Sequence, residues 1–503
     1  MLGTLSRTAL PSPTTCTPLR MCSVVHSIRA GGNLDDASTR RGGSIHGSLQ
    51  HGVGVPDKFS LANGDSLDHD VLPNILVTIR QARSVPSHVP ERAAFYQSRL
   101  HGRKIDPLKR FAILFHSPYN FAAMKIESVD VFPCGLPFRG HFKIAGGAVA
   151  KSGDLVPHIF VRIRDTDGYE GWGEARPSRQ WSYETEETVT TTLQKYLAPA
   201  IVGQEVFDAA AIQRILHREI ANSVTVGQPI AKSAIDTALH DLICRRLKTP
   251  LRKFAGANAT DGITLSWTVT GSTLAEIESS VDSGGKAGYR NFNFKLGLGP
   301  KIDEETPRLL RNHLPKAFLW ADANQAYDVA TAVKVSRQLA AVGIDVFEQP
   351  LKAGNILGLR ELRRKSALPI AIDEPLCDPE FLLTLVRMNA IDIFVLKVAR
   401  SGGVGPAMRM LALARTAGLG ILGSGLTESR VNLTACAQLL AAYGVTEPAA
   451  LNGPQFLSDD VVRDGVEIRG DRVILSEEPG LGLTIDSRKF RQYMRPGAAT
   501  SKL

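Results

Sequence analysis

Apolar runs of about five to seven residues recur along the second half of the chain, and stretches with helical spacing of apolar positions separate them. The strand-like runs are residues 263–269, 291–296, 317–322, 344–348, 369–373, 391–397 and 419–423. The helix-like stretches include residues 273–287, 328–342, 355–366, 379–388 and 403–417. Seven strand–helix repeats of about 25 residues each predict a closed parallel barrel rather than an open sheet.

The pattern before residue 256 predicts an α+β unit instead. Alternating positions predict strands at 125–132 and 158–164, and helical spacing predicts helices at 184–197, 206–220 and 231–247. After residue 445 the regularity weakens into short strands and turns. We therefore expect an N-terminal extension, an α+β capping domain, a barrel domain, and a segment that returns to the cap before a tail, at residues 1–123, 124–255, 256–465 and 466–503 respectively.

Residues 1–123 show no sustained periodicity and are rich in Gly, Ser, Pro and His. This composition favours a disordered extension. Met124 opens the first predicted strand, so the extension could also be a leader, or an artefact of the gene model, that precedes a start at Met124.

Five consecutive barrel strands each end in one charged residue. In chain order these residues are Lys295, Asp322, Glu348, Asp373 and Lys397. Because a parallel barrel brings the C-terminal ends of its strands around one mouth, we expect the five charges to converge. A single acidic residue at a strand end is often a helix cap or a solvated loop residue. Three on successive strands instead form a hard oxygen site suited to Mg²⁺.

The two lysines flank the three carboxylates in barrel order. An ammonium group after a buried strand should either be held by the carboxylates or have a lowered pKa, and a lowered pKa makes a usable general base. A substrate carboxylate bound to Mg²⁺ between Lys295 and Lys397 could lose its α-proton to one of them. The metal would stabilise the resulting enediolate.

These motifs resemble a known family. They are Phe294-Lys295-Leu296-Gly297, Asp322-Ala-Asn324-Gln-Ala, Phe347-Glu348-Gln-Pro, Asp373-Glu374-Pro, and Leu396-Lys397 followed after four intervening residues by Gly402-Gly403. The chain resembles the enolase superfamily, in the muconate lactonizing enzyme (muconate cycloisomerase) subgroup of the mandelate racemase–muconate lactonizing enzyme family. The resemblance covers roughly residues 124–490 and includes Trp172-Gly-Glu174 and Ala231-Lys-Ser-Ala-Ile-Asp236.

The resemblance implies an α/β fold, with a modified (β/α)7β TIM-type barrel under an N-terminal α+β capping domain. It implies that Lys295 and Lys397 are the acid/base pair. It also implies a Mg²⁺ cofactor, with Mn²⁺ as an alternative, held by Asp322, Glu348 and Asp373. Residues that would support these groups or contact the substrate are Asn324, Glu374 and Glu428. One departure is Asn293, where the subgroup usually has a lysine, so Lys295 should keep a higher pKa unless burial compensates.

The reaction class narrows further because His313 is the only histidine between residues 256 and 480, and it does not end a strand. A mechanism with a barrel histidine as second base therefore lacks its residue. We expect a Mg²⁺-dependent isomerase of a small carboxylic acid or dipeptide, either a racemase/epimerase or a muconate-type cycloisomerase. A dehydratase of an acid sugar or hydroxy acid and a non-catalytic barrel that acts as a binding protein remain alternatives.

Substrate specificity in the resembled family comes from cap loops that close over the mouth. The candidates here are residues 139–147 and 176–183. Two glycines in the first segment suit a mobile lid, although a plain surface turn fits equally well. Its basic residues Arg139, His141 and Lys143 could bind a second carboxylate of the substrate.

Composition excludes two classes of function. No apolar run approaches the roughly 18 residues that span a bilayer. The formal net charge is +9, but two thirds of the excess lies in residues 1–123, which argues against a basic nucleic-acid surface on the rest of the chain. The six cysteines are scattered without metal spacing, as expected of free thiols.

The two ends of the chain carry possible targeting features. Residues 1–34 hold arginines, many Ser and Thr and no acid, which is typical of a transit peptide. The sequence ends in Ser501-Lys502-Leu503, the peroxisomal import signal, after a small-residue tail that should leave it accessible. We predict a peroxisomal location, or a peroxisome-derived organelle, with the import receptor as a partner; the mitochondrion and the cytoplasm are the alternatives. We also expect a homo-oligomer.

Overall fold

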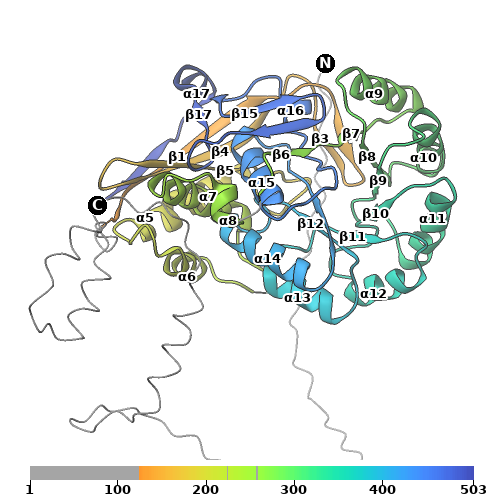
Figure 1. Ribbon diagram of the computed structural model, residues 1–503, viewed down its shortest axis with the longest axis horizontal. Coiled ribbons are helices and arrows are strands. Elements are labelled where there is room, and N and C mark those ends of the chain that lie inside the picture. Colours follow the sequence, from red (N-terminus) through yellow and green to blue (C-terminus); the bar gives the residue numbers. More distant parts are fainter. Residues whose placement is uncertain (1–123, 224, 257–258) are drawn as a thin grey trace, which may run out of the picture. The chain divides into compact units, whose positions relative to one another are not determined.

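The computed structural model describes residues 124–223, 225–256 and 259–503 (Figure 1). All of them belong to one compact unit. The predictions for residues 1–123 lie outside the described residues.

A seven-stranded parallel sheet forms the barrel, with its strands in sequence order from β7 to β13. The strands are β7 (Trp267–Val269), β8 (Phe292–Lys295), β9 (Leu319–Asp322), β10 (Val346–Glu348), β11 (Ile370–Ile372), β12 (Ile393–Leu396) and β13 (Gly420–Gly423). The gap between β13 and β7 is bridged by residues 449–450, through the parallel pairs Leu265–Ala449 and Ser424–Ala450. This short segment stands where an eighth strand would close the ring.

Helices lie outside the barrel strands (Figure 1). They are α9 (Leu274–Lys286), α10 (Pro300–His313), α11 (Val329–Ala341), α12 (Ile356–Lys365), α13 (Pro379–Arg387), α14 (Val404–Thr416) and α15 (Arg430–Ala442); the short helix α16 (Gly453–Phe456) instead packs on the cap through Phe456. Polar side chains cap the N-termini of several of these helices. Asp328 accepts a hydrogen bond from Thr331 N at the start of α11, and Asp378 accepts one from Phe381 N at the start of α13. Helix α15 is buried along almost its whole length, so it shows no polar face that a sequence pattern could reveal.

The cap is a four-stranded antiparallel sheet in the order β18-β1-β4-β5 with helices against it. The strands are β1 (Ile126–Pro137), β4 (Leu155–Asp165), β5 (Glu170–Ala175) and β18 (Ala499–Lys502); the helical segments are α4 (Glu186–Thr192), η2 (Leu193–Leu197), α5 (Ala198–Ile201), α6 (Ala209–Glu219), α7 (Pro229–Arg246) and α8 (Leu251–Ala255). Helix α7 lies directly on β5, because Gly171 and Gly173 have no side chain. A Cβ on Gly173 would come within 2.0 Å of Ala234 O.

The segment predicted as a lid, residues 139–147, is part of a β-hairpin. Its strands are β2 (Phe142–Ile144) and β3 (Gly147–Ala150). Lys143 in β2 exchanges hydrogen bonds with the hydroxyl of Thr270, which follows β7, so the hairpin is attached to the barrel.

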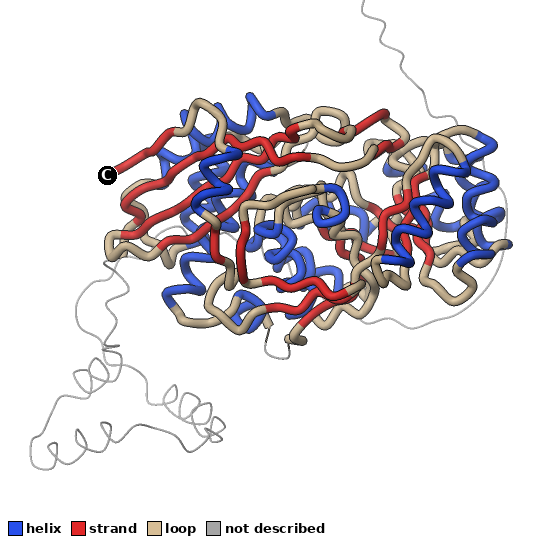
Figure 2. Tube along the Cα trace, turned by 90° about the horizontal axis from the view of Figure 1, so that it is seen from above, coloured by secondary structure: helices blue, strands red, loops and turns tan. Residues whose placement is uncertain are grey.

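The C-terminal part of the chain serves both domains. Strands β15 (Val466–Arg469) and β16 (Arg472–Leu475) join β6 (Gly262–Thr264), while β14 (Val462–Asp464) pairs with β17 (Thr484–Ile485). Helix α17 (Ser487–Tyr493) and β18 then pack on β1 of the cap, at the chain end marked C in Figure 2.

The C-terminal tail, which was expected to leave Ser501-Lys502-Leu503 accessible, forms strand β18, and Leu503 is exposed. Strand β18 pairs with β1 in the register Lys502–Ser128, and Leu503 N donates to Glu127 O at 3.0 Å. The side chains of this segment are small and polar, but it forms a strand because β1 has an unpaired edge.

The peroxisomal location stays a prediction. Within the described residues, no helix has the length and apolarity required to cross a bilayer.

Candidate active site

The five strand-end charges surround the barrel mouth, as the strand pattern predicted. Lys295, Asp322 and Glu348 are the last residues of β8, β9 and β10, and the sheet register pairs Lys295 with Asp322 and Asp322 with Glu348. Asp373 and Lys397 each follow their strand by one residue. All five side chains are buried. Parallel pairing explains this convergence, because equivalent positions of neighbouring strands lie side by side at one edge.

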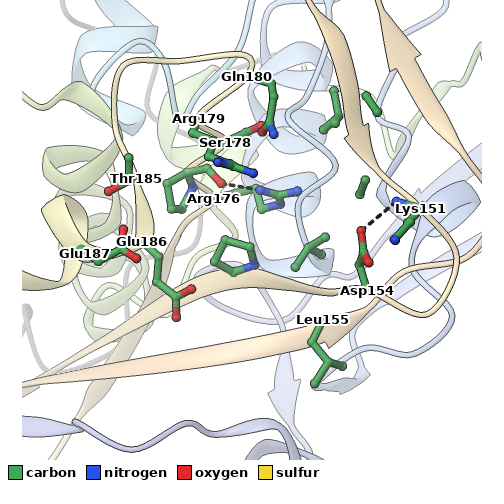
Figure 3. A pocket seen from close by; sticks show the side chains of 16 residues that line it. Lys151, Asp154, Leu155, Arg176, Ser178, Arg179, Gln180, Thr185, Glu186 and Glu187 are labelled. Carbon is green, nitrogen blue, oxygen red and sulfur yellow. Dashed lines mark hydrogen bonds between the residues drawn. The ribbon is translucent and has the colours of Figure 1, made fainter. Parts of the chain in front are cut away.

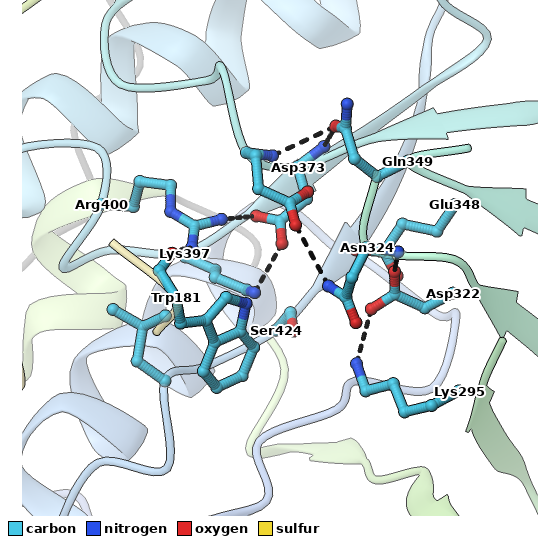
Figure 4. A network of polar contacts seen from close by, with 12 residues as sticks. Trp181, Lys295, Asp322, Asn324, Glu348, Gln349, Asp373, Lys397, Arg400 and Ser424 are labelled. Carbon is cyan, nitrogen blue, oxygen red and sulfur yellow. Dashed lines mark hydrogen bonds and ion pairs between the residues drawn. The ribbon is translucent and has the colours of Figure 1, made fainter. Parts of the chain in front are cut away.

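Two ion pairs link the lysines to the carboxylates (Figure 4). Lys295 Nζ lies 2.5 Å from Asp322 Oδ2, and Lys397 Nζ lies 2.6 Å from Asp373 Oδ2. Arg400 binds the second oxygen of Asp373. The sequence did not indicate Arg400; its place three residues after Lys397, on the loop that leads into α14, was the available signal.

The three carboxylates have the chemistry of a hard-cation site. Burial, and then the charges of Asp322 and Asp373, raise the pKa of Glu348 well above its ordinary value, so the three groups act on one another. Repulsion among buried carboxylates is relieved when a divalent cation binds them. Over residues 124–503, apart from the short gaps, no three His, Cys, Asp or Glu side chains are gathered as ready ligands. Asp322 and Asp373 point to the lysines instead, so their role as ligands stays a prediction.

The ammonium group of Lys295 is held by carboxylates, which was one of the two expected outcomes. Burial would lower the pKa of Lys295, but the charges of Asp322 and Glu348 outweigh it and raise that pKa. Asn293 is buried two residues before Lys295, and its Oδ1 accepts from Ser266 Oγ at 2.9 Å and Thr268 Oγ1 at 3.1 Å. The neutral side chain of Asn293 also keeps the pKa of Lys295 high, because a lysine at this position would have repelled the ammonium group of Lys295 and lowered its pKa.

Trp181 from the cap covers both lysines. Its ring centre lies 4.5 Å from Lys397 Nζ and 5.7 Å from Lys295 Nζ, and Phe142 of β2 packs edge-on against it at 5.4 Å. Both distances suit cation–π attraction. The sequence selected residues 176–183 as a lid but gave no reason to single out Trp181.

A cavity of about 410 Å³ opens at the mouth, between cap and barrel. We call it the mouth cavity; its lining residues are Ile144, Ala145, Gly146, Gln180, Trp181, Gly297, Asn324, Gln325, Ala326, Lys352 and Glu374. Asn324 Nδ2 donates to Glu374 Oε1 at 3.1 Å, but Asn324 Oδ1 and Glu374 Oε2 lack a partner in the described structure. Asn324 also holds a left-handed backbone (φ 40°), a strain typical of functional sites.

Glu428 lies buried in the loop after β13, and its role in supporting the site or contacting the substrate stays a prediction. Its carboxylate accepts from Leu426 N, and burial followed by the charge of Glu174 raises its pKa to about 7. Glu174 of the cap in turn accepts from Ser429 N at 2.8 Å, next to Glu428. The loop that carries Glu428 is therefore attached to the cap.

Two of the other cavities bear on the predicted site residues, and both lie apart from the five charges. One of about 470 Å³ is lined by cap residues, among them Arg176 and Glu186 (Figure 3). The other, of about 1060 Å³, runs along α9 and is lined by Arg139, His141 and Lys143. The basic cluster was suggested as a binding site for a second substrate carboxylate, but none of its three residues lines the mouth cavity.

Comparisons with known proteins agree with this architecture. Residues 128–256 match the mandelate racemase / muconate lactonizing enzyme N-terminal domain, and residues 274–489 match the enolase C-terminal domain-like family. A chloromuconate cycloisomerase from Pseudomonas putida is 30% identical over 381 residues, which cover 74% of this chain and 100% of the relative. An L-Ala-D/L-Glu epimerase from Clostridium acetobutylicum is 30% identical over 365 residues, 72% of this chain and 99% of the relative.

Among solved structures, a dipeptide epimerase from Enterococcus faecalis, complexed with Mg and the dipeptide L-Leu-L-Tyr, is 26% identical with a TM-score of 0.67. The match covers 72% of this chain and 99% of that one. Two matched domains, full coverage of curated relatives and a shared fold lead to one conclusion: the chain belongs to the mandelate racemase–muconate lactonizing enzyme family of the enolase superfamily.

Proposed function

We propose that this protein is a Mg²⁺-dependent isomerase that removes the proton α to a substrate carboxylate, with racemisation or epimerisation as the first candidate. The observation that carries the proposal is the placement of the two lysines. Lys295 and Lys397 lie on opposite sides of β9, β10 and β11, and both lie under Trp181.

Asp322, Glu348 and Asp373 would hold the Mg²⁺ ion. When bound, the ion supplies positive charge to the carboxylates and to the negative charge that develops on the substrate carboxylate. Carboxylates that held the ion would pair less closely with the lysines; since Asp322 and Glu348 raise the pKa of Lys295, a weaker pairing would let this lysine release its proton more readily.

Opposed lysines permit a 1,1-proton transfer. One takes the α-proton from one face of the substrate, and the other returns a proton to the opposite face, which inverts the centre. A cycloisomerisation uses the same groups, with one lysine exchanging a proton with the product. Trp181 and Phe142 limit the access of water to both ammonium groups, because they cover them from the cap side.

The test follows deuterium incorporation from D₂O with MgCl₂, at the α-carbons of L-Ala-L-Glu and at the α-carbon of the lactone formed from cis,cis-muconate. Wild-type protein should incorporate deuterium at the α-carbon of the inverted product. Lys295→Ala and Lys397→Ala should each abolish racemisation, while each single variant can retain exchange on the one face that its remaining lysine serves.

Lys301→Ala, at an exposed lysine of α10, is the matched control and should behave as wild type. Exchange that survives in both active-site variants with unchanged stereochemistry would refute the assignment. Calorimetry with MgCl₂ separates this enzyme from a non-catalytic barrel, because a binding protein without metal chemistry should give no heat of Mg²⁺ binding.

A further inference from the structure

The mouth cavity has one cation among its lining residues, Lys352, in the loop that follows β10. Trp181 and Asn324, which line the same cavity, are buried, whereas Lys352 is exposed. Lys352 therefore marks the outer end of the cavity, and Asn324 and Trp181 mark the end nearer the five strand-end charges.

Hydrogen bonds hold the backbone on each side of Lys352. Gln349 Nε2 donates to Leu351 O at 2.9 Å, Ala353 N donates to Gln325 Oε1 at 2.9 Å, and Asn355 N donates to Lys352 O at 2.9 Å. The loops after β9 and β10 are thus joined, and the Cα of Lys352 is fixed at the cavity edge.

The side chain of Lys352 is available to a ligand. Across the residues that the structure describes, no carboxylate oxygen lies within 4.0 Å of its ammonium group, as for most exposed lysines there; Lys253 and Lys365 are the paired exceptions. A fixed backbone with an unpaired ammonium group suits recognition of an anion that arrives with the substrate.

We infer that Lys352 is a specificity-determining residue that binds a second anionic group of the substrate, at the end away from the reacting carboxylate. The inference rests on the proposed function, because that function sets which carboxylate lies among the strand-end charges. The unpartnered Asn324 Oδ1 and Glu374 Oε2 lie along the same cavity and suit an N–H or O–H group between the two anionic ends. The cavity volume of about 410 Å³ suits a small two-ended acid of this kind.

The test measures binding separately from turnover. Wild type, Lys352→Ala and Lys352→Arg are titrated by calorimetry, in MgCl₂, with dicarboxylates of four to six carbons and with the monoamide of each. The matched control is Lys143→Ala, which removes the same charge from the cavity along α9. Wild type should bind at least one diacid about tenfold more tightly than its monoamide, as expected for a charged hydrogen bond. Lys352→Ala should abolish that preference, Lys352→Arg should retain it, and Lys143→Ala should leave it unchanged.

A second arm compares deuterium exchange for L-Ala-L-Glu and L-Ala-L-Gln. Lys352→Ala should raise KM for the acidic dipeptide about tenfold, with kcat within about twofold of wild type. If neither dipeptide exchanges while the diacid preference still follows Lys352, the proposed function fails and the anion site stands. If wild type shows no diacid preference, or if Lys143→Ala removes it and Lys352→Ala does not, the inference about Lys352 is overturned.

Discussion

Glu174 offers the sharpest test of how the cap is held on the barrel. This buried cap carboxylate accepts from Ser429 N at 2.8 Å and Ser429 Oγ at 2.6 Å, and from Asn432 N at 3.1 Å, all at the start of α15. His158 Nδ1 lies 2.6 Å from it within the cap. Burial lowers the pKa of His158 well below its usual range, so the ring is neutral and donates Nδ1–H to the carboxylate.

Glu174→Gln keeps the size of the side chain but replaces one acceptor oxygen with an NH₂ donor. Two of the four donors then face a group that cannot accept, and each buried donor left unpaired costs about 1–3 kcal/mol. Removing the charge offsets part of this destabilisation. Burial raises the pKa of Glu174, which means that burying the charged carboxylate is unfavourable, and the neutral amide has no such desolvation cost. The expected net loss is about 2 kcal/mol in the free energy of unfolding.

Urea unfolding followed by circular dichroism measures this loss. The control is Glu304→Gln, which changes an exposed carboxylate paired with Arg308 and should shift the free energy of unfolding by less than about 0.5 kcal/mol. A Glu174→Gln midpoint equal to that of wild type would show that these contacts do not hold the cap to α15, and the reasoning would be wrong.

Three further predictions concern the cap. Gly173→Ala should cost about 3 kcal/mol or more in thermal unfolding, because its Cβ would meet Ala234 O; Gly285→Ala, in open space on α9, should cost nothing. Burial raises the pKa of Glu184 from 4.5 to about 7, so the folded state binds this proton more tightly than the unfolded state, and stability falls as pH rises between those values. Removing the group in Glu184→Gln should therefore shrink the stability lost between pH 5 and pH 8 by about 2 kcal/mol, measured by urea midpoints. Trp181→Ala should lower the rate of α-proton exchange about tenfold, and Trp181→Phe should retain most of it, since an aromatic ring still covers the lysines.

The barrel and its central charges could be predicted because their signals are local. Each apolar run with one terminal charge, such as Phe294-Lys295 or Phe347-Glu348, is readable in a window of a few residues. Because neighbouring parallel strands end at the same edge of the sheet, the residues at their C-terminal ends come together there, and no other feature of the sequence is needed to predict this. The order of the strands also placed the lysines on opposite sides of the carboxylates.

The elements that were missed lack such a local signal. Helix α15 is enclosed by both domains, so its sequence has no polar face, and α10 carries an internal proline, Pro307. The tail 499–502 becomes a strand only because β1 offers it an unpaired edge. In each case the deciding partner is distant in sequence.

The sequence by itself determined the family of fold, the three carboxylates and the two lysines, because all of them follow from the repeat that builds the barrel. Only the tertiary structure decided which residues complete the mouth. In the folded chain Trp181 covers the two lysines, Arg400 pairs with Asp373, and Lys352 rather than Lys143 lines the mouth cavity. These choices depend on how the cap packs on the barrel, and contacts between segments far apart in the chain leave no periodic trace in the sequence.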